Sequence, residues 1–224
     1  MAAGCDSQAT GDDIAVIQGC FGCDKASARR LATIMTSRSF AHRSAIAHAG
    51  DRSATLFLVV EGAVVAELFG YDGQQAQLNR HGPGEIFGAY PDETTYRSGY
   101  SASGATRLLA VPTARLVELV ASDCAIAAGV AALLARQLDL VLDRMAARIG
   151  LSATGRFYRA LLQLGDADGL IKPAPVIASL AVSVHTTRET ASRALAALTR
   201  RGIVERQEDA LQIVSRRMLE ELIV

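Results

Sequence analysis

The sequence predicts an α+β protein with three consecutive parts: an N-terminal antiparallel β-barrel or jelly roll, a long helix, and a C-terminal winged helix-turn-helix. Three observations lead to this prediction. Glycine turns recur about every eleven residues in the first half, helical periodicity runs from residue 122 to about 149, and a capped polar helix start at residue 187 precedes two short strand patterns. We place the three parts at residues 1–121, 122–150 and 151–224.

The first part combines a short helix with a series of strands. Residues 26–35 have the pattern of a short helix. Strands are then expected at residues 55–60, 63–69, 75–79 and 107–111. They are separated by the turns Gly50-Asp51, Glu61-Gly62, Asp72-Gly73 and Gly82-Pro83-Gly84. Regular short strands with Asp-Gly turns are typical of an antiparallel barrel or jelly roll.

The middle part is one long amphipathic helix that follows a short helix at residues 113–121. Ser122 or Asp123 is expected to cap it. One apolar seam contains Ala127, Ala131, Leu134, Leu138, Val141 and Met145, and a neighbouring face contains Val130, Leu133 and Leu140. Because two apolar faces need two partners, we expect the neighbouring face to contact the barrel and Leu134, Leu138, Val141 and Met145 to form a parallel homodimer interface. The alternative is that the C-terminal domain of the same chain covers the seam.

The third part has the pattern of two helices and a β-hairpin. Apolar residues at helical spacing in residues 176–184 predict the first helix, and His185-Thr186 forms the turn, where such motifs often have glycine. Histidine tolerates a positive φ better than most residues do. The second helix is expected to bury Ala191, Ala194, Leu195 and Leu198 and to end at Arg200, Arg201 and Gly202. Residues 203–206 and 210–214 predict a two-stranded wing.

The start of the second helix predicts contact with the major groove of DNA. Thr187 is expected to cap the helix, while Arg188, Glu189, Ser192 and Arg193 share its exposed side. Arginine pairs with the O6 and N7 atoms of guanine, and glutamate accepts from N4 of cytosine. We therefore take Thr187, Arg188, Glu189, Ser192 and Arg193 as the candidate DNA-binding residues. The alternative is an ordinary amphipathic helix with solvated charges.

Charge and composition limit the partners and the compartment. The whole chain is neutral, with 23 basic and 23 acidic residues, but residues 172–217 contain eight basic and four acidic residues, enough for phosphate contacts. No run of eighteen apolar residues and no secretion signal is visible, so we expect no membrane partner, a cytoplasmic location and reduced cysteines.

The order of these parts resembles the Crp/Fnr superfamily of bacterial transcription regulators. The motif Arg188-Glu189-Thr190-Ala191-Ser192-Arg193 is similar to the recognition helix of the family. Further similarities are Gly62, Gly84, Phe87 and Gly88 in the barrel and Thr154-Gly155-Arg156 at the entry to the C-terminal domain. The resemblance implies a homodimer that binds double-stranded DNA with a near-palindromic site, contacts RNA polymerase and responds to an effector in the barrel. Arg188, Glu189 and Arg193 would contact bases, with Ser192 as a further contact.

The resemblance also implies an effector site, with two departures from the usual one. Cyclic-nucleotide members of the family bind the phosphate through a short helix start, an arginine and a hydroxyl residue, for which Gly88, Arg97 and Ser98 are the matching residues. Ala89 stands at the place of the ribose-binding glutamate, and Val141 and Leu142 stand where hydroxyl residues reach the base. These six residues form the candidate site for a cyclic nucleotide (cAMP or cGMP). A regulator without a small-molecule response is the alternative.

Cysteines and histidines suggest other sensors. Cys5, Cys20, Cys23 and Cys124 would be the ligands of an iron–sulfur cluster, as in oxygen-sensing relatives, or a thiol switch, although buried structural cysteines are commoner. His42, His48 and His81 lie in the barrel region, where one of them would be a haem ligand. A cupin-like metal enzyme needs clustered histidines, which these spacings do not provide, and no catalytic motif is present. We therefore predict no metal site and no enzymatic activity.

Overall fold

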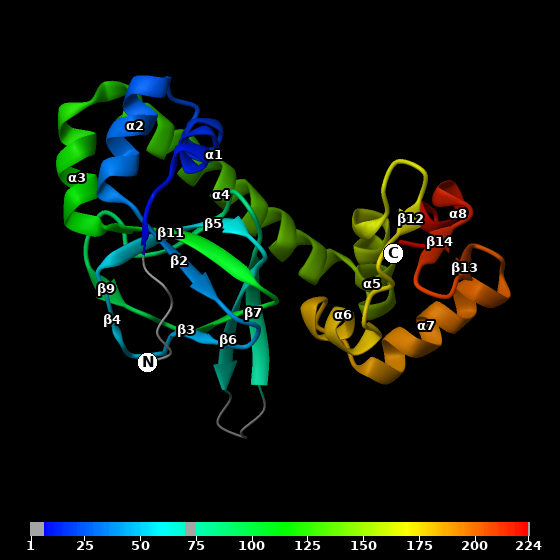
Figure 1. Ribbon diagram of the computed structural model, residues 1–224. Helices are drawn as coiled ribbons and strands as arrows, with labels where there is room; N and C mark the ends of the chain where they lie inside the picture. The colour runs from blue at the N-terminus through cyan, green and yellow to red at the C-terminus, as the bar shows by residue number, and fades with distance from the viewer. Residues whose placement is uncertain (1–6, 70–74, 224) are drawn as a thin grey trace. The chain divides into compact units, whose positions relative to one another are not determined.

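The structure, a computed structural model, describes residues 7–69 and 75–223 (Figure 1). The chain divides into two compact units, residues 1–140 and 141–224, and each is described by itself. Helix α4 (Cys124–Gly150) contributes residues to both units.

The first unit is built on two antiparallel sheets arranged as a jelly roll, without the closure of a barrel. The five-stranded sheet has the order β1 (Ser7–Gln8), β2 (Thr36–Phe40), β11 (Thr106–Pro112), β5 (Thr55–Glu61) and β8 (Ile86–Gly88). The four-stranded sheet has the order β3 (Ala45–Ala47), β10 (Gly99–Ala102), β6 (Val64–Phe69) and β7 (Gln75–His81). A small sheet pairs β4 (Arg52–Ser53) with β9 (Thr94–Thr95). The antiparallel architecture and the predicted strands are thus confirmed.

Alternating side chains of the central strands bury both faces of the five-stranded sheet. Phe57, Val59 and Leu108 belong to the interior of the jelly roll, whereas Leu56 and Leu109 face the helices. Because successive side chains of a strand point to opposite faces, a strand buried on both faces has a continuous apolar sequence, as residues 56–60 do.

Three helices cover the outer face of this sheet: α1 (Gly11–Phe21), α2 (Lys25–Ile34) and α3 (Thr113–Ser122). Figure 1 shows them grouped together beyond one face of the jelly roll. The expected helices at residues 26–35 and 113–121 are confirmed, with Met35 following α2 as its cap residue. Helix α1 lies outside the prediction.

Helix α4 presents one stripe to the core of the first unit and leaves another stripe exposed. Ile126, Gly129, Val130 and Leu133 are buried. The expected contact of Val130 and Leu133 with the first unit is therefore confirmed, but that of Leu140 is wrong, because its side chain is 40% exposed. By length and composition alone, α4 could cross a membrane, although the sequence contains no uninterrupted run of eighteen apolar residues. Its buried stripe instead packs into the core of the first unit.

The second unit has four further helices and a three-stranded sheet. The helices are α5 (Ala153–Leu164), α6 (Ile177–Ser183), α7 (Arg188–Arg200) and α8 (Arg216–Glu220). The antiparallel sheet has the order β12 (Leu170–Ile171), β14 (Leu211–Ile213) and β13 (Val204–Arg206). Its core includes all four residues predicted for the inner side of the second helix, namely Ala191, Ala194, Leu195 and Leu198. The winged helix-turn-helix is thus confirmed, with β12 and α8 as additions.

Candidate nucleic-acid interface and effector region

The N-terminus of α7 is capped by Thr187. This residue has extended backbone angles, and its Oγ1 atom accepts a hydrogen bond from the backbone N–H of Thr190 at 3.1 Å. The bond satisfies one of the free amides of the first turn and fixes where the helix begins. The predicted cap is therefore confirmed.

The polar side chains on the opening turns of α7 are all exposed. Arg188, Glu189, Ser192 and Arg193 lie on the surface, while Ala191 on the opposite side is fully buried. The surface thus offers two guanidinium donors, one carboxylate acceptor and one hydroxyl, which are the groups that distinguish base pairs in a major groove. The core beneath them holds the helix rigidly, so their spacing is set by the helix itself.

The turn before α7 has a left-handed residue that an arginine holds in place. His185 has φ of 55°, where motifs of this kind often have glycine. Arg156 of α5 donates hydrogen bonds to the carbonyl oxygens of Leu151 at 2.9 Å, Val184 at 2.8 Å and His185 at 2.8 Å. Burial lowers the pKa of His185, and the nearby charges of Arg148 and Arg156 lower it further. The role of Arg156 was not evident from the sequence, apart from its place in the Thr154-Gly155-Arg156 motif.

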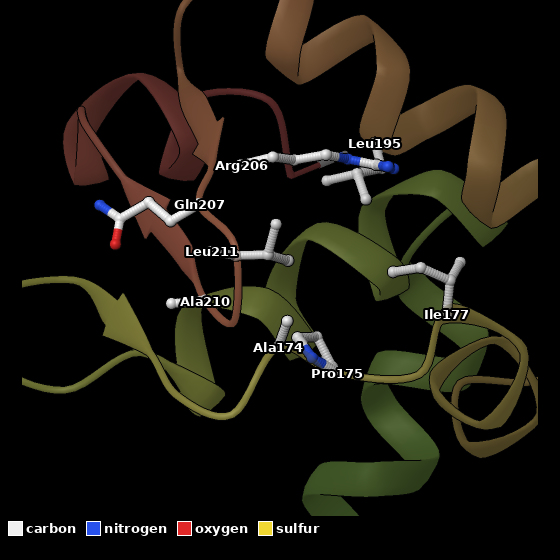
Figure 2. A pocket seen from close by; sticks show the side chains of 8 residues that line it. All are labelled: Ala174, Pro175, Ile177, Leu195, Arg206, Gln207, Ala210 and Leu211. Atoms are coloured by element: carbon white, nitrogen blue, oxygen red, sulfur yellow. The ribbon is translucent and has the colours of Figure 1, made fainter.

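A cavity of about 180 Å³ separates the wing from the helices of the second unit (Figure 2). It is lined by Ala174, Pro175, Ile177, Leu195, Arg206, Gln207, Ala210 and Leu211. Figure 2 shows the Arg206 side chain extending toward Leu195 of α7, whereas that of Gln207 points away. A cavity of this size is slightly larger than one that admits benzene in an engineered protein core. Unlike such an enclosed cavity, this one is partly open to solvent.

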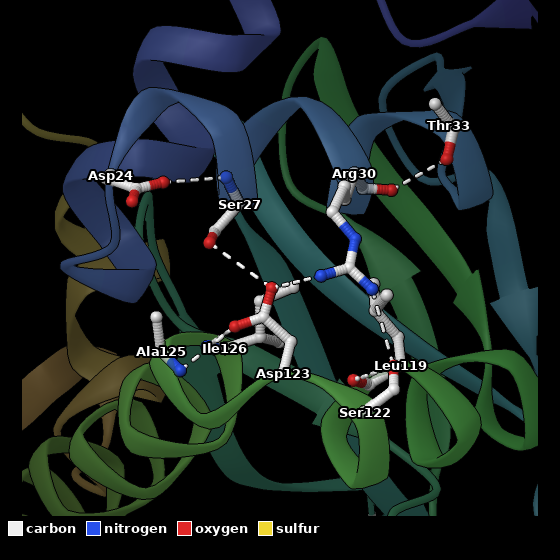
Figure 3. A network of polar contacts seen from close by, with 9 residues as sticks. All are labelled: Asp24, Ser27, Arg30, Thr33, Leu119, Ser122, Asp123, Ala125 and Ile126. Carbon is white, nitrogen blue, oxygen red and sulfur yellow. Dashed lines mark hydrogen bonds and ion pairs between the residues drawn. The ribbon is translucent and has the colours of Figure 1, made fainter.

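The start of α4 is fixed by Asp123 (Figure 3). Its Oδ1 atom accepts from the amides of Ala125 at 3.0 Å and Ile126 at 3.2 Å, which confirms the predicted cap. Its Oδ2 atom accepts from Ser27 at 3.3 Å and pairs with Arg30, both on α2. Further along α4, the predicted seam residues Leu134, Leu138 and Met145 are 39%, 58% and 52% exposed, and Val141 is half-buried. An anchored helix thus presents an apolar face to solvent.

The backbone at Gly88 and Ala89 is bonded within the first unit. Gly88 has φ of +109°, and a Cβ atom there would lie 2.2 Å from the carbonyl oxygen of Thr55, so only glycine fits. The N–H of Ala89 donates to the same oxygen at 3.0 Å, and the carbonyl of Ala89 accepts from Thr113 Oγ1 at 2.8 Å. The methyl group of Ala89 is buried and supplies no acceptor for a ribose hydroxyl.

The other predicted effector residues differ in their exposure. Arg97 is exposed, and Ser98 beside it is 2% exposed. Both belong to the first unit with Gly88 and Ala89. Val141 and Leu142 belong to the second unit, where Leu142 is 52% exposed.

An aromatic stack that was not expected from the sequence lies in the interior of the jelly roll. The ring of Phe87 lies 5.0 Å from that of Phe57 and 4.8 Å from that of Tyr100, both in stacked geometry. His81 is buried against the same stack, at 5.5 Å from Phe87. Phe57 and Phe87 lie next to apolar residues of their strands, and this is the signal that could have placed them on buried strand positions.

Cysteines and histidines do not gather into a ligand set. Across residues 7–69 and 75–223, no group of three or more His, Cys, Asp or Glu side chains is arranged to hold a metal ion. Burial raises the thiol pKa of Cys20 and of Cys23, which disfavours the reactive thiolate. Cys124 is the first residue of α4 and is exposed, while Cys5 lies outside the described residues. His42 Nδ1 accepts from the amide of Gly104 at 2.9 Å.

Comparison with known proteins assigns both units. Residues 37–123 match the cyclic nucleotide-binding domain family, and residues 155–222 match the Crp-like helix-turn-helix domain family. The chain is 33% identical to the cyclic AMP receptor protein of Thermus thermophilus over 186 residues, which are 79% of this chain and 83% of that protein. Its fold is similar to that of FixK2 from Bradyrhizobium japonicum, with a TM-score of 0.73, 23% identity, and coverage of 85% of this chain and 98% of that one. It is also similar to CLP from Xanthomonas campestris, with a TM-score of 0.70, 20% identity, and coverage of 86% and 100%.

A relative of this identity and coverage, together with the two matched domains in the same order, shows the family. The chain belongs to the Crp/Fnr family of transcription regulators.

Proposed function

We propose that this regulator is a cytoplasmic homodimer that reads a near-palindromic DNA site through Arg188, Glu189, Ser192 and Arg193. The observation that carries the proposal is the capped start of α7, where these four side chains are exposed above a buried core. Arg188 and Arg193 pair with guanine edges, Glu189 accepts from cytosine, and Ser192 adds a hydrogen bond. Basic residues elsewhere in the second unit contact phosphates and fix the register.

The dimer is formed by the exposed seam of α4. Leu134, Leu138, Val141 and Met145 recur at spacings of four and three residues, which suits the packing of two parallel helices. Burying this face removes large apolar side chains from water, which favours association. A two-fold dimer then presents two copies of α7 to half-sites one helical turn of DNA apart. RNA polymerase is the proposed partner of the DNA-bound dimer.

The effector is a cyclic nucleotide, cAMP or cGMP, bound in the jelly roll. Arg97 and Ser98 are proposed to hold its phosphate, with Gly88 and Ala89 at the adjoining turn. The family resemblance alone makes Val141 and Leu142 candidates for contact with the base. The matched domain family and the cyclic AMP receptor protein of Thermus thermophilus support this class of ligand. Because Ala89 replaces an acidic residue, the ribose is recognised less strongly than in relatives that have glutamate there. The ligand changes DNA binding only if it binds one arrangement of the dimer better than another.

Selection of duplexes from a random pool, followed by fluorescence anisotropy, tests the proposal. Each of Arg188→Ala and Arg193→Ala is expected to relax base preference at one position and to cost about 1–3 kcal/mol of binding free energy. Arg115→Ala on α3, which removes an exposed arginine paired with Glu118 in the first unit, is the matched control and should leave base preference unchanged. Titration of the same complex with cAMP and cGMP tests the effector. A monomer in sedimentation, or equal affinity for every duplex, would contradict the proposal.

A further inference from the structure

We propose that Gln137 is a positioning residue, through which the interior of the jelly roll sets the orientation of the α4 seam. This inference rests on the proposed dimer and on its effector-dependent DNA binding. Gln137 is a half-buried polar residue that continues the buried stripe formed by Ile126, Val130 and Leu133. A polar side chain at such a position is expected to have specific partners, because burying it without them is unfavourable.

The side chain of Gln137 bonds to two consecutive residues at the start of β8. Its Oε1 atom accepts from the backbone N–H of Ile86 at 3.2 Å, and its Nε2 atom lies 3.5 Å from Glu85 Oε2. An amide side chain can accept from an N–H and donate to a carboxylate at the same time. The contact therefore joins α4 to the turn between β7 and β8 in a specific orientation.

From this turn, contacts continue into the aromatic stack. Glu85 Oε1 accepts from the N–H of Gly82 at 3.3 Å, and Glu85 Oε2 lies 3.9 Å from His81 Nδ1. The His81 ring lies 5.5 Å from that of Phe87, which directly follows Ile86 on β8. A displacement of the Phe87 ring is therefore expected to reach the two groups that hold Gln137 through His81 and the β8 backbone.

On the other side, Gln137 adjoins the seam. Leu138 is the next residue and is 58% exposed, and Val141 lies one helical turn further. Because Leu134 and Leu138 lie on the same helix within the first unit, rotation of α4 at Gln137 turns these seam residues with it. Release of the Gln137 contacts is expected to spread the dimer over more arrangements of its two recognition helices. The fraction that is competent to bind both half-sites then falls.

The test is a residue exchange measured on the full-length chain. Gln137→Glu places a carboxylate against Glu85, whereas Glu85→Gln combined with Gln137→Glu restores one donor and one acceptor in reversed order. Ala132→Glu adds the same charge at an exposed position of α4 and is the matched control. We expect Gln137→Glu to weaken binding of the selected duplex by about tenfold per folded dimer, and the double exchange to recover most of that loss. Ala132→Glu should bind as the unchanged protein does.

Hydrogen exchange separates a positioning role from a merely structural one. The rate of hydrogen exchange at the Ile86 amide should rise in Gln137→Glu and should return to that of the unchanged protein in the double variant. Gln137→Met, which keeps the length of the side chain without its hydrogen bonds, serves if the charged variant does not fold. Unchanged duplex affinity of a folded Gln137→Glu or Gln137→Met dimer, or a double exchange no better than Gln137→Glu, overturns the inference. Failure of the unchanged protein to dimerise or to select a duplex overturns the proposed function first, and the inference with it.

Discussion

Replacing Arg156 by alanine is expected to destabilise the second unit by about 3 kcal/mol. A hydrogen bond from a charged donor contributes about 1.5–3 kcal/mol, and Arg156 donates one to each of three carbonyl oxygens. The side chain is half-buried, so the freed carbonyls partly recover bonds to water and the loss is less than the three bonds together. Two of these carbonyls belong to Val184 and His185. A left-handed conformation at a residue other than glycine costs about 1–2 kcal/mol, and Arg156 holds His185 in it.

Urea unfolding followed by circular dichroism measures the loss of stability, and fluorescence anisotropy with the selected duplex measures DNA affinity. Arg156→Lys keeps the charge but reaches fewer carbonyls, so an intermediate loss is expected. Arg159→Ala, on the same helix, is the matched control and should change stability by less than about 0.5 kcal/mol. Adding His185→Gly to Arg156→Ala should restore about 1 kcal/mol, because glycine adopts a positive φ without strain. An Arg156→Ala variant within about 1 kcal/mol of the unchanged protein, with equal DNA affinity, would refute this account of the turn.

Three further changes test packing and charge. Gly129→Ala places a Cβ atom 2.3 Å from the carbonyl oxygen of Phe21 and should lower the free energy of unfolding by about 2–3 kcal/mol, measured by thermal unfolding. Gly150→Ala is the control, because its Cβ atom would have no atom within 4 Å and should not lower the free energy of unfolding. The folded-state pKa of His185 is lowered, so the stability that its neutral form contributes is present above about pH 6.5 and is lost as the pH falls through the folded pKa. The free energy of unfolding of the second unit should therefore decrease on acidification. His185→Asn should flatten this pH dependence in urea unfolding. Ala210→Val adds methyl groups beside the wing cavity and should raise the unfolding free energy by about 0.5–1 kcal/mol, and a decrease would indicate that the cavity cannot take them.

The helix-turn-helix could be predicted because its signals are local. A cap at Thr187, the apolar spacing of Ala191 and Leu198, and a glycine stop at Gly202 all lie within one stretch of chain. The left-handed turn at His185 was also anticipated, since histidine tolerates that conformation. Strand β12 has two residues and pairs with β14 far along the chain, so no local pattern marks it.

Helix α1 was missed although its signals are present. Asp13 Oδ2 accepts from the N–H of Thr10 at 2.8 Å, and Gly22 ends the helix with φ of 60°. Ile17 and Phe21 are buried one turn apart. The ion pair between Asp13 and Arg107, which ties the helix to β11, joins residues 94 positions apart. A pairing of this kind cannot be inferred from spacing along the chain.

The effector region was harder to predict because burial, not residue type, decides what its residues can do. Arg97 and Ser98 are adjacent in the sequence, yet one is exposed and the other is buried. The bond between Gln137 and Ile86 joins residues 51 positions apart and depends on how α4 lies against β8. A motif gives the residue types of such a site but not their exposure.

Ala89 illustrates how a sensory domain can differ from its relatives without a change of fold. The residue is 1% exposed, and its backbone is bonded to Thr55 and Thr113. A glutamate here would bury a carboxylate, which is unfavourable unless a ligand or a cation pairs with it. With alanine, the backbone of Ala89 is satisfied by the carbonyl of Thr55 and the hydroxyl of Thr113, and this turn does not depend on an occupant for its hydrogen bonds.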